Sequence, residues 1–185
     1  DYYSVQPINA NMSQLGVFVG DVMGHGVSAA LFMALLKFLT DQLFEECGLD
    51  PRQYLERLNR TLMHQMPMSF ATGIYGTFSG HIPGEPIHLQ LAGAGHPFPL
   101  LWRRATGRVE NVQLKGNAAL GLTEMFSTES IDLTLESGDM LLLYTDGVTE
   151  SSNDADEMFG AERLADLLCR TAQPNAARTL EDIMS

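Results

Sequence analysis

Apolar and polar positions divide the first third of the chain into one strand and two helices. Residues 15–19 are apolar and end at Gly20-Asp21, which predicts a buried strand leading into a loop. Residues 27–46 are apolar on nearly every side, so they predict a buried or interface helix. A second helix is predicted over 52–65, where Leu55, Leu58 and Leu62 share one face.

The middle of the chain changes to strand-like patterns. Residues 71–81 are rich in glycine, threonine and aromatic side chains and predict a strand that ends before a turn at Pro83-Gly84. Residues 87–91 alternate, which places Ile87, Leu89 and Leu91 on the buried face. Further strands are predicted at 2–5, 99–103, 109–114, 131–135 and 140–145, and further helices at 161–171 and 176–184. This order predicts an α+β sandwich in a single domain over 1–185.

Composition and charge exclude several classes of protein. The chain has 185 residues and a mean hydropathy of -0.02, so it can form a sizeable core. Its formal net charge is -12, and nucleic acids and anionic lipids need a cationic surface, so we expect it to bind neither. Cys47 and Cys169 form no C-x-x-C pair, which argues against a cysteine zinc site and fits a reducing compartment.

The ends of the chain and its longest apolar stretch indicate in which compartment of the cell we expect the protein. Residues 29–39 contain Lys37 and fall short of the roughly 20 apolar residues that a membrane span needs. We therefore expect a soluble, cytoplasmic protein. The chain opens at Asp1 without a methionine or a signal peptide, so we expect a fragment that is shortened at both ends.

Two aspartates at strand ends are the strongest candidates for chemistry. Asp21 follows the apolar run 15–19, Asp146 follows 141–145, and each lies beside a glycine. Carboxylate oxygens suit hard divalent cations such as Mg²⁺ and Mn²⁺. The alternative is that Asp21 caps the following helix and Asp146 only begins a turn, and the spacing alone leaves both interpretations open.

Other chemistry is less well supported. The sequence has no phosphate-binding P-loop, no complete nucleophile elbow and no zinc-protease motif. His25 and His96 lie in glycine- or proline-containing loops, where a histidine more often shapes the loop by bonding to the backbone than acts in catalysis.

Five collinear blocks resemble a known family. Residues 19–31, VGDVMGHGVSAAL, resemble the D-x-x-G-H-G-x-x-A-A motif of bacterial PP2C-type (PPM) phosphatases, and in particular of the SpoIIE/RsbU group. Residues 93–101 resemble N-A-G-H-P-x-P-L-L, 141–150 resemble L-L-L-Y-T-D-G-V-T-E, and 159–164 resemble F-G-x-E-R-L. Residues 1–3 resemble the end of the opening G-G-D-Y-Y-D motif.

The resemblance implies a fold and a metal site. The fold is a pair of antiparallel sheets packed face to face with helices outside. The site holds two Mn²⁺ or Mg²⁺ ions: Asp21 bridges them, the backbone carbonyl of Val22 and the carboxylate of Asp146 bind one ion each, and Asp1 holds the outer edge or a metal-bound water. Asp21 and Asp146 are the catalytic residues, because the ions they hold lower the pKa of a shared water that attacks phosphorus in line. The loop residues implied around the ions are Gly24, His25, Gly26, His96 and Gly147.

The chain departs from the family pattern at three places. Ser4 stands where a second aspartate is usual, and Gly93 stands where an asparagine is usual. The family's closing D-D-x-T motif has no convincing match, because Glu181-Asp182 lies in a helical stripe. We therefore expect the last metal ligand to lie beyond Ser185.

The resemblance implies a metal-dependent serine/threonine phosphatase that acts on a phosphoprotein such as an anti-sigma-factor antagonist. It also implies an upstream sensor or receiver domain, and the helix over 27–46 is a candidate surface for a homodimer. The alternative is a PP2C-like adaptor that has lost activity and acts by protein binding alone.

Overall fold

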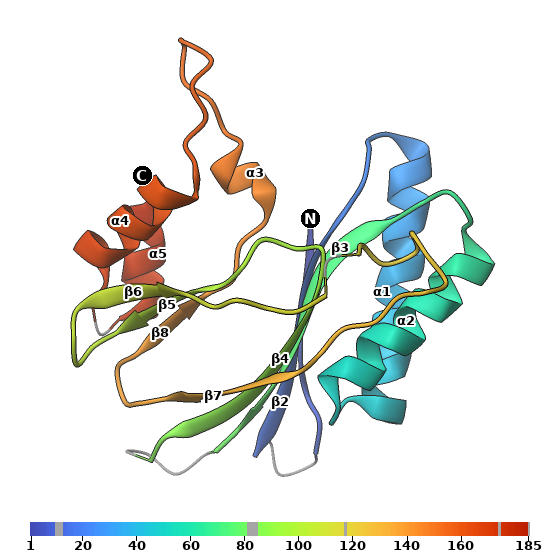
Figure 1. The fold of residues 1–185 in the computed structure, drawn as a ribbon, viewed down its shortest axis with the longest axis horizontal. Coiled ribbons are helices and arrows are strands. Elements are labelled where there is room, and N and C mark those ends of the chain that lie inside the picture. The colour runs from blue at the N-terminus through green and yellow to red at the C-terminus, as the bar shows by residue number, and fades with distance from the viewer. Residues whose placement is uncertain (10–12, 81–84, 117, 174, 185) are drawn as a thin grey trace. The chain divides into compact units, whose positions relative to one another are not determined.

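A computed structural model of the chain describes residues 1–9, 13–80, 85–116, 118–173 and 175–184 (Figure 1). The predicted turn at Pro83-Gly84 and the end of the predicted strand over 71–81 lie outside these residues. The chain forms two compact units, the first made of Asp1–His96 and Leu114–Thr134 and the second of Pro97–Gln113 and Leu135–Ser185. The prediction of a single domain over 1–185 stays a prediction.

Unit 1 is built on a five-stranded sheet. Its strands are β1 (Tyr2–Pro7), β2 (Gln14–Val22), β3 (Ala71–Ser79), β4 (Ile87–Ala94) and β7 (Ile131–Leu135), in the order β1-β2-β3-β4-β7. The pairs β1–β2, β2–β3 and β3–β4 are antiparallel. Burial alternates along β2, where Phe18 and Val22 are buried and the residues between them are mostly half-buried. The strand therefore presents one face to a core and the other to the opposite side of the sheet.

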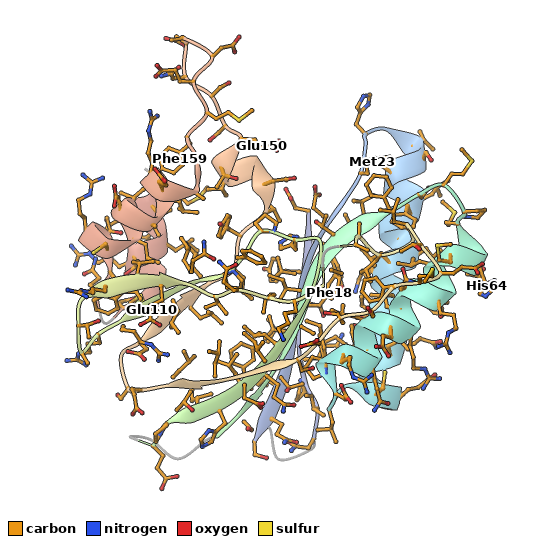
Figure 2. All side chains as sticks on the ribbon, viewed as in Figure 1. Phe18, Met23, His64, Glu110, Glu150 and Phe159 are labelled. Carbon is orange, nitrogen blue, oxygen red and sulfur yellow. The ribbon has the colours of Figure 1, made fainter. Side chains whose placement is uncertain are left out.

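Two helices, α1 (Val27–Cys47) and α2 (Pro51–Gln65), cover one face of this sheet (Figure 1). The core between them is aromatic: the rings of Tyr54 and Tyr75 stack with centroids 3.8 Å apart, and Phe44 meets both edge-on. Figure 2 shows Phe18 in this core. Both tyrosine hydroxyls are satisfied, since Tyr54 donates to the carbonyl of Thr40 at 3.0 Å and Tyr75 to that of Gly48 at 2.7 Å. Burial raises the pKa of both phenols.

The start of α2 follows from its sequence. Asp50 is extended and its side chain accepts a hydrogen bond from the backbone N–H of Gln53 at 3.1 Å, while Pro51 occupies the first turn, where no N–H is needed. Leu55, Leu58 and Leu62 are all fully buried, which confirms the face predicted from their spacing.

Helix α1 is apolar well beyond its buried face. Its mean hydropathy reaches 1.5 over an 18-residue window, so length and composition alone would allow it to cross a membrane, and core helices of soluble proteins pass the same test. Phe32, Leu36 and Leu43 are buried against the core of unit 1. Val27, Leu31 and Phe38 are exposed on another side of the helix.

Unit 2 holds a three-stranded antiparallel sheet and its own helices. The strands β5 (Leu100–Arg103), β6 (Arg108–Asn111) and β8 (Met140–Leu142) have the order β6-β5-β8, and the helices are α3 (Asp146–Thr149), α4 (Ala161–Thr171) and α5 (Ala176–Met184). Leu164 and Leu168 of α4 pack with Leu100 and Tyr144 in the core of this unit. The predicted α+β class, with two antiparallel sheets and flanking helices, is confirmed.

Four details differ from the sequence prediction. Strand β2 continues through Asp21 to Val22, because pairing with β3 extends to Ala71. Ile87, predicted to be buried, is 38% exposed at the start of β4. Strands β6 and β8 are shorter than predicted, and Asp146 begins the short helix α3, which the prediction did not include.

Candidate functional site

Asp21 lies in β2, one residue before the end of the strand. The register of β1 and β2 pairs Tyr2 with Gly20 and so brings Asp1 beside Asp21. The Asp1 nitrogen lies 2.9 Å from Oδ1 of Asp21, and the Asp21 side chain is 28% exposed. Two of the predicted metal ligands are therefore neighbours at one end of the unit 1 sheet, and Val22, whose carbonyl is the third, follows Asp21 directly.

A third strand supports this end of the sheet. Thr72 of β3 pairs with Asp21 in the antiparallel register. The Thr72 hydroxyl lies 2.8 Å from Nδ1 of His96, which is buried just after β4. His96 thus has a side-chain partner in Thr72, and the interpretation of His96 as a loop-shaping residue stays a prediction.

The link through Thr72 was missed by the sequence analysis. The sequence pattern of residues 71–79 does not distinguish Thr72 from Thr77. Only the register of β3 against β2 shows that Thr72, and not Thr77, lies beside the aspartate.

The loop between β2 and α1 has open space around two of its glycines. Gly24 and Gly26 have φ angles of 93° and 83°, a region that side chains disfavour, and no atom lies within 4 Å of where a Cβ would be at either position. Gly26 is the N-terminal cap of α1 and no side chain caps the helix. The alternative in which Asp21 caps this helix is therefore wrong. His25, between the two glycines, is exposed.

Asp146 and Gly147 form the first turn of α3 in unit 2. Thr145 is extended before the helix, and the Asp146 carbonyl accepts from the N–H of Glu150 at 2.7 Å. The Asp146 side chain is half-buried and follows the buried Tyr144. Asp21 and Asp146 belong to different units, so their predicted convergence stays a prediction.

The two departures from the family pattern lie within unit 1. The Ser4 hydroxyl accepts a 3.3 Å hydrogen bond from Nε2 of Gln6, so this hydrogen bond lies within β1. The carbonyl of Gly93 accepts a hydrogen bond from the Thr128 hydroxyl at 2.8 Å, and a Cβ at Gly93 would meet the Leu114 side chain at 3.0 Å. A larger residue at Gly93 would need Leu114 to move.

The donor chemistry at the end of β2 suits a hard divalent cation. Asp21 places a carboxylate at the end of β2, Asp1 lies beside it directly before β1, and carboxylate oxygens are the ligands that Mg²⁺ and Mn²⁺ prefer. In the part of the chain that the structure describes, no three His, Cys, Asp or Glu side chains gather into a metal-binding cluster. The metal ligands predicted from the sequence therefore stay a prediction.

A comparison with protein families matches the SpoIIE model, described as stage II sporulation protein E, over residues 11–185. The chain is 30% identical over 151 residues to phosphoserine phosphatase RsbU of Bacillus subtilis, a match that covers 81% of this chain and 42% of that protein. It is also 30% identical over 156 residues to phosphoserine phosphatase RsbP of the same organism, covering 81% of this chain and 36% of RsbP. The chain thus spans less than half of either relative.

Solved structures agree with the fold. The RsbU and RsbW domains of Rv1364c from Mycobacterium tuberculosis match with a TM-score of 0.76 and 28% identity, over 98% of this chain and 48% of that one. The SiaA-PP2C domain of Pseudomonas aeruginosa matches with a TM-score of 0.80 and 22% identity, over 99% and 69% of the two chains. The second likeness, at this identity, concerns the fold alone.

Proposed function

Because the chain belongs to the SpoIIE family and has a PP2C-like fold, we propose that it is the catalytic domain of a metal-dependent protein serine/threonine phosphatase in bacterial signalling. The named relatives RsbU and RsbP are phosphoserine phosphatases, which supports a phosphoserine protein as the substrate.

The observation that carries this proposal is the pairing of Asp1 with Asp21 at the end of β2. The strand register brings the two residues together, and the positively charged amino group of Asp1 lies 2.9 Å from Oδ1 of Asp21, so this partly exposed carboxylate already faces a positive group. The Thr72–His96 hydrogen bond lies on the neighbouring strand, where Thr72 pairs with Asp21. A partly exposed carboxylate at the end of a sheet is a ligand that a divalent cation can use.

In this proposal Asp1, Asp21, the carbonyl of Val22 and Asp146 hold two Mn²⁺ or Mg²⁺ ions. The chemistry that such ions supply when bound is the activation of a water for in-line attack on phosphorus and the stabilisation of charge on the phosphoryl oxygens. The chain's own part is to hold the carboxylates in position: Asp1 directly precedes β1, β2 supplies Asp21, and α3 supplies Asp146.

The test is to replace Asp21 by Asn and to measure Mn²⁺-dependent release of phosphate from a phosphoserine protein and from an aryl phosphate. Loss of a group that supports a metal ligand typically lowers activity by about 10- to 100-fold, so loss of the ligand itself should lower it by at least about a hundredfold. Asp132→Asn is the matched control: it makes the same chemical change on β7, where the carboxylate is exposed and accepts a hydrogen bond from Gln90.

Two outcomes would contradict the proposal. Full activity in Asp21→Asn would show that this carboxylate does not hold the metal. An absence of Mn²⁺-dependent, EDTA-sensitive turnover in a longer protein that carries the complete C-terminal part of the domain would favour the adaptor alternative.

The finer parts of the proposal concern partners and location. We expect an anti-sigma-factor antagonist as the phosphoprotein, an upstream sensor or receiver domain, and a cytoplasmic location without nucleic-acid or membrane binding. The net charge of -12 supports the last two exclusions, because both surfaces are anionic.

A homodimer through α1 is the remaining proposal on partners. Val27, Leu31 and Phe38 lie at spacings of four and seven residues on one side of α1, and each is more than half exposed. A second copy of α1 would cover this side. Leu31→Asp should then shift the sedimentation coefficient toward the monomer, whereas an unchanged coefficient would exclude this surface.

A further inference from the structure

A small hollow lies in unit 1 beside the end of β2. It has a volume of about 210 Å³ and sits between the start of α1 and the Met68-Ser69 connection that leads from α2 toward β3. The nearly fully buried Phe32 and the partly buried Ala29 form its apolar part. Met23, labelled in Figure 2 where the chain leaves β2 for α1, lies at its rim.

The size and lining of this hollow restrict what it can hold. Pockets for cofactors and drug-sized ligands are typically about 300–1,000 Å³, so this one suits a single large side chain. Among the described residues that line it, His25 is the only one with an ionisable side chain, and no carboxylate is present to attract a basic group. The described lining of the hollow therefore has no group that would pair with a basic side chain, and its wall of Phe32 and Ala29 suits an uncharged, apolar one.

The hollow lies close along the chain to the proposed metal site, although Asp21 does not line it. Val22 and Met23 follow Asp21 directly, so the rim is two residues, or roughly 7 Å of extended chain, from the carboxylate. Val22 is buried on the helix face of β2, whereas Asp21 is on the opposite face, so a ligand that reaches both must cross the loop between them. Gly24 and Gly26 lie in this loop and have no atom within 4 Å of their Cβ positions, so their backbone is open to an approaching ligand.

The two methionines at the rim suit a binding role. Met68 is 95% exposed and Met23 is 54% exposed, although both are apolar. Met68 also has a φ of 71°, a conformation that costs a residue other than glycine on the order of 1–3 kcal/mol and that is often found at functional sites. Methionine side chains are flexible and polarizable, so they adapt to different apolar partners.

We infer that this hollow, between Met23, Met68 and Phe32, is a specificity subsite that receives an apolar side chain within a few residues of the phosphorylated residue of the substrate. The inference rests on the proposed phosphatase function and names a feature of its substrate. Burial of one leucine-sized side chain here should raise kcat/KM by about tenfold or more.

The test uses a longer protein that carries the complete C-terminal part of the domain, with Mn²⁺ and a set of phosphoserine peptides in an alanine background. Each peptide carries one leucine at a different position within three residues of the phosphoserine, and a matched set carries asparagine instead. Hydrolysis is measured as kcat/KM, and binding is measured separately by fluorescence anisotropy. We expect one position at which leucine exceeds asparagine by about tenfold.

Variants of the hollow connect the preference to these residues. Ser28→Leu, at an exposed position of α1 that lines the hollow, should fill it and reduce the leucine-to-asparagine ratio toward one. Met68→Ala should reduce the ratio by severalfold. Met125→Ala is the matched control: it removes another exposed methionine of unit 1, one that does not line this hollow, and should leave the ratio unchanged.

The possible outcomes distinguish a failure of the subsite inference from a failure of the phosphatase proposal. Hydrolysis without a positional preference, or a preference that survives Ser28→Leu, would overturn the subsite and leave the phosphatase proposal standing. Preferential binding of a leucine peptide without hydrolysis would support the subsite and contradict the phosphatase proposal. Neither hydrolysis nor preferential binding would contradict both.

Discussion

A single buried amide joins two distant parts of unit 1. Asn59 of α2 is 3% exposed; its Nδ2 donates to the carbonyl of Thr123 at 3.0 Å, and its Oδ1 accepts from the N–H of Gly121 at 2.8 Å. These bonds hold the segment that follows Leu120, which itself pairs with Ala71 at the start of β3. The Asn59 side chain thus fixes the position of the segment that follows Leu120.

We predict that Asn59→Ala lowers the free energy of unfolding by roughly 2–3 kcal/mol, because it leaves a buried N–H and a carbonyl without their partner. Urea unfolding followed by circular dichroism measures the change. Asn111→Ala, at an exposed site on β6, is the matched control and should change stability by less than about 0.5 kcal/mol. Equal effects of the two substitutions would contradict the role given to Asn59.

A buried carboxylate has a comparable role in unit 2. The Asp139 side chain is 2% exposed and accepts hydrogen bonds from Nη1 of Arg103 at 2.8 Å and from the backbone N–H groups of Arg104 and Glu136. Burial alone raises the pKa of this carboxyl, but the hydrogen bonds and the guanidinium outweigh it and hold the pKa below the ordinary value of 3.8.

A pKa that is lower in the folded than in the unfolded state adds stability above the unfolded value. We predict that Asp139→Asn lowers the free energy of unfolding by about 2 kcal/mol at neutral pH. The difference from the native chain should shrink as the pH falls from 3.8, where the unfolded carboxyl takes up a proton, through the lower pKa of the folded carboxyl. Trp102, the only tryptophan, lies beside Arg103 on β5 and reports unfolding of unit 2 by fluorescence.

Glu110→Gln is the control for this measurement. Glu110 is the other partner of Arg103, but it is 57% exposed and its carboxylate lies 3.5 Å from Nε. An exposed ion pair contributes little, so this substitution should change stability by less than about 1 kcal/mol at any pH. A pH-independent difference between the native chain and Asp139→Asn would contradict the assignment.

At the scale of elements, side chains near the middle of α1 attach the edge strand β1. The Tyr2 hydroxyl lies 3.2 Å from Oγ1 of Thr40, and Nε2 of Gln6 donates to Oδ1 of Asp41 at 2.6 Å. Thr40 donates its own proton to the carbonyl of Lys37, so Tyr2 is the donor in the first of these bonds. Strand β1 pairs with β2 alone, and these bonds supply a second attachment beside Asp1.

We predict that Thr40→Val, which keeps the shape of the side chain, destabilises the chain by about 1 kcal/mol and speeds hydrogen exchange of the β1 amides in particular. Thr61→Val is the matched control, because Thr61 bonds only to the carbonyl of Arg57 within its own helix. Unchanged exchange in β1 would show that pairing with β2 suffices to hold the strand.

The elements that the sequence predicted best are those with local causes. The spacing of apolar residues predicted α1, α2, α4 and α5 to within about one residue at each end, because their buried faces repeat along the helix. The short β6, β8 and α3 were predicted poorly. Residues 140–145 read as one apolar strand, yet only Met140–Leu142 pairs with β5, and this depends on how far β5 extends.

At the scale of the whole molecule, the residues of the candidate site also divide into those with a local sequence signal and those that depend on contacts between distant segments. Strand patterns and motif spacing selected Asp21 and Asp146 as metal ligands, a role that stays a prediction, and the register brings Asp1 beside Asp21. Thr72 and the hollow beneath Met68 could not be identified, because each depends on contacts between segments far apart in the chain. A sequence motif can indicate a candidate ligand. The residues that hold this ligand in position become visible only in the contacts of the folded chain.

The final prediction concerns the two units together. If Asp21 of unit 1 and Asp146 of unit 2 hold the same pair of ions, Mn²⁺ must stabilise unit 2 through a residue of unit 1. At a free concentration of 100 times Kd, a ligand that binds only the folded state adds about 2.7 kcal/mol to stability. We predict that Mn²⁺ raises the unfolding midpoint reported by Trp102, that EDTA reverses the effect, and that either Asp21→Asn or Asp146→Asn abolishes it. Asp132→Asn should retain it. An effect of Mn²⁺ that survives Asp21→Asn but not Asp146→Asn would show that unit 2 binds the ion alone, and the shared site would be wrong.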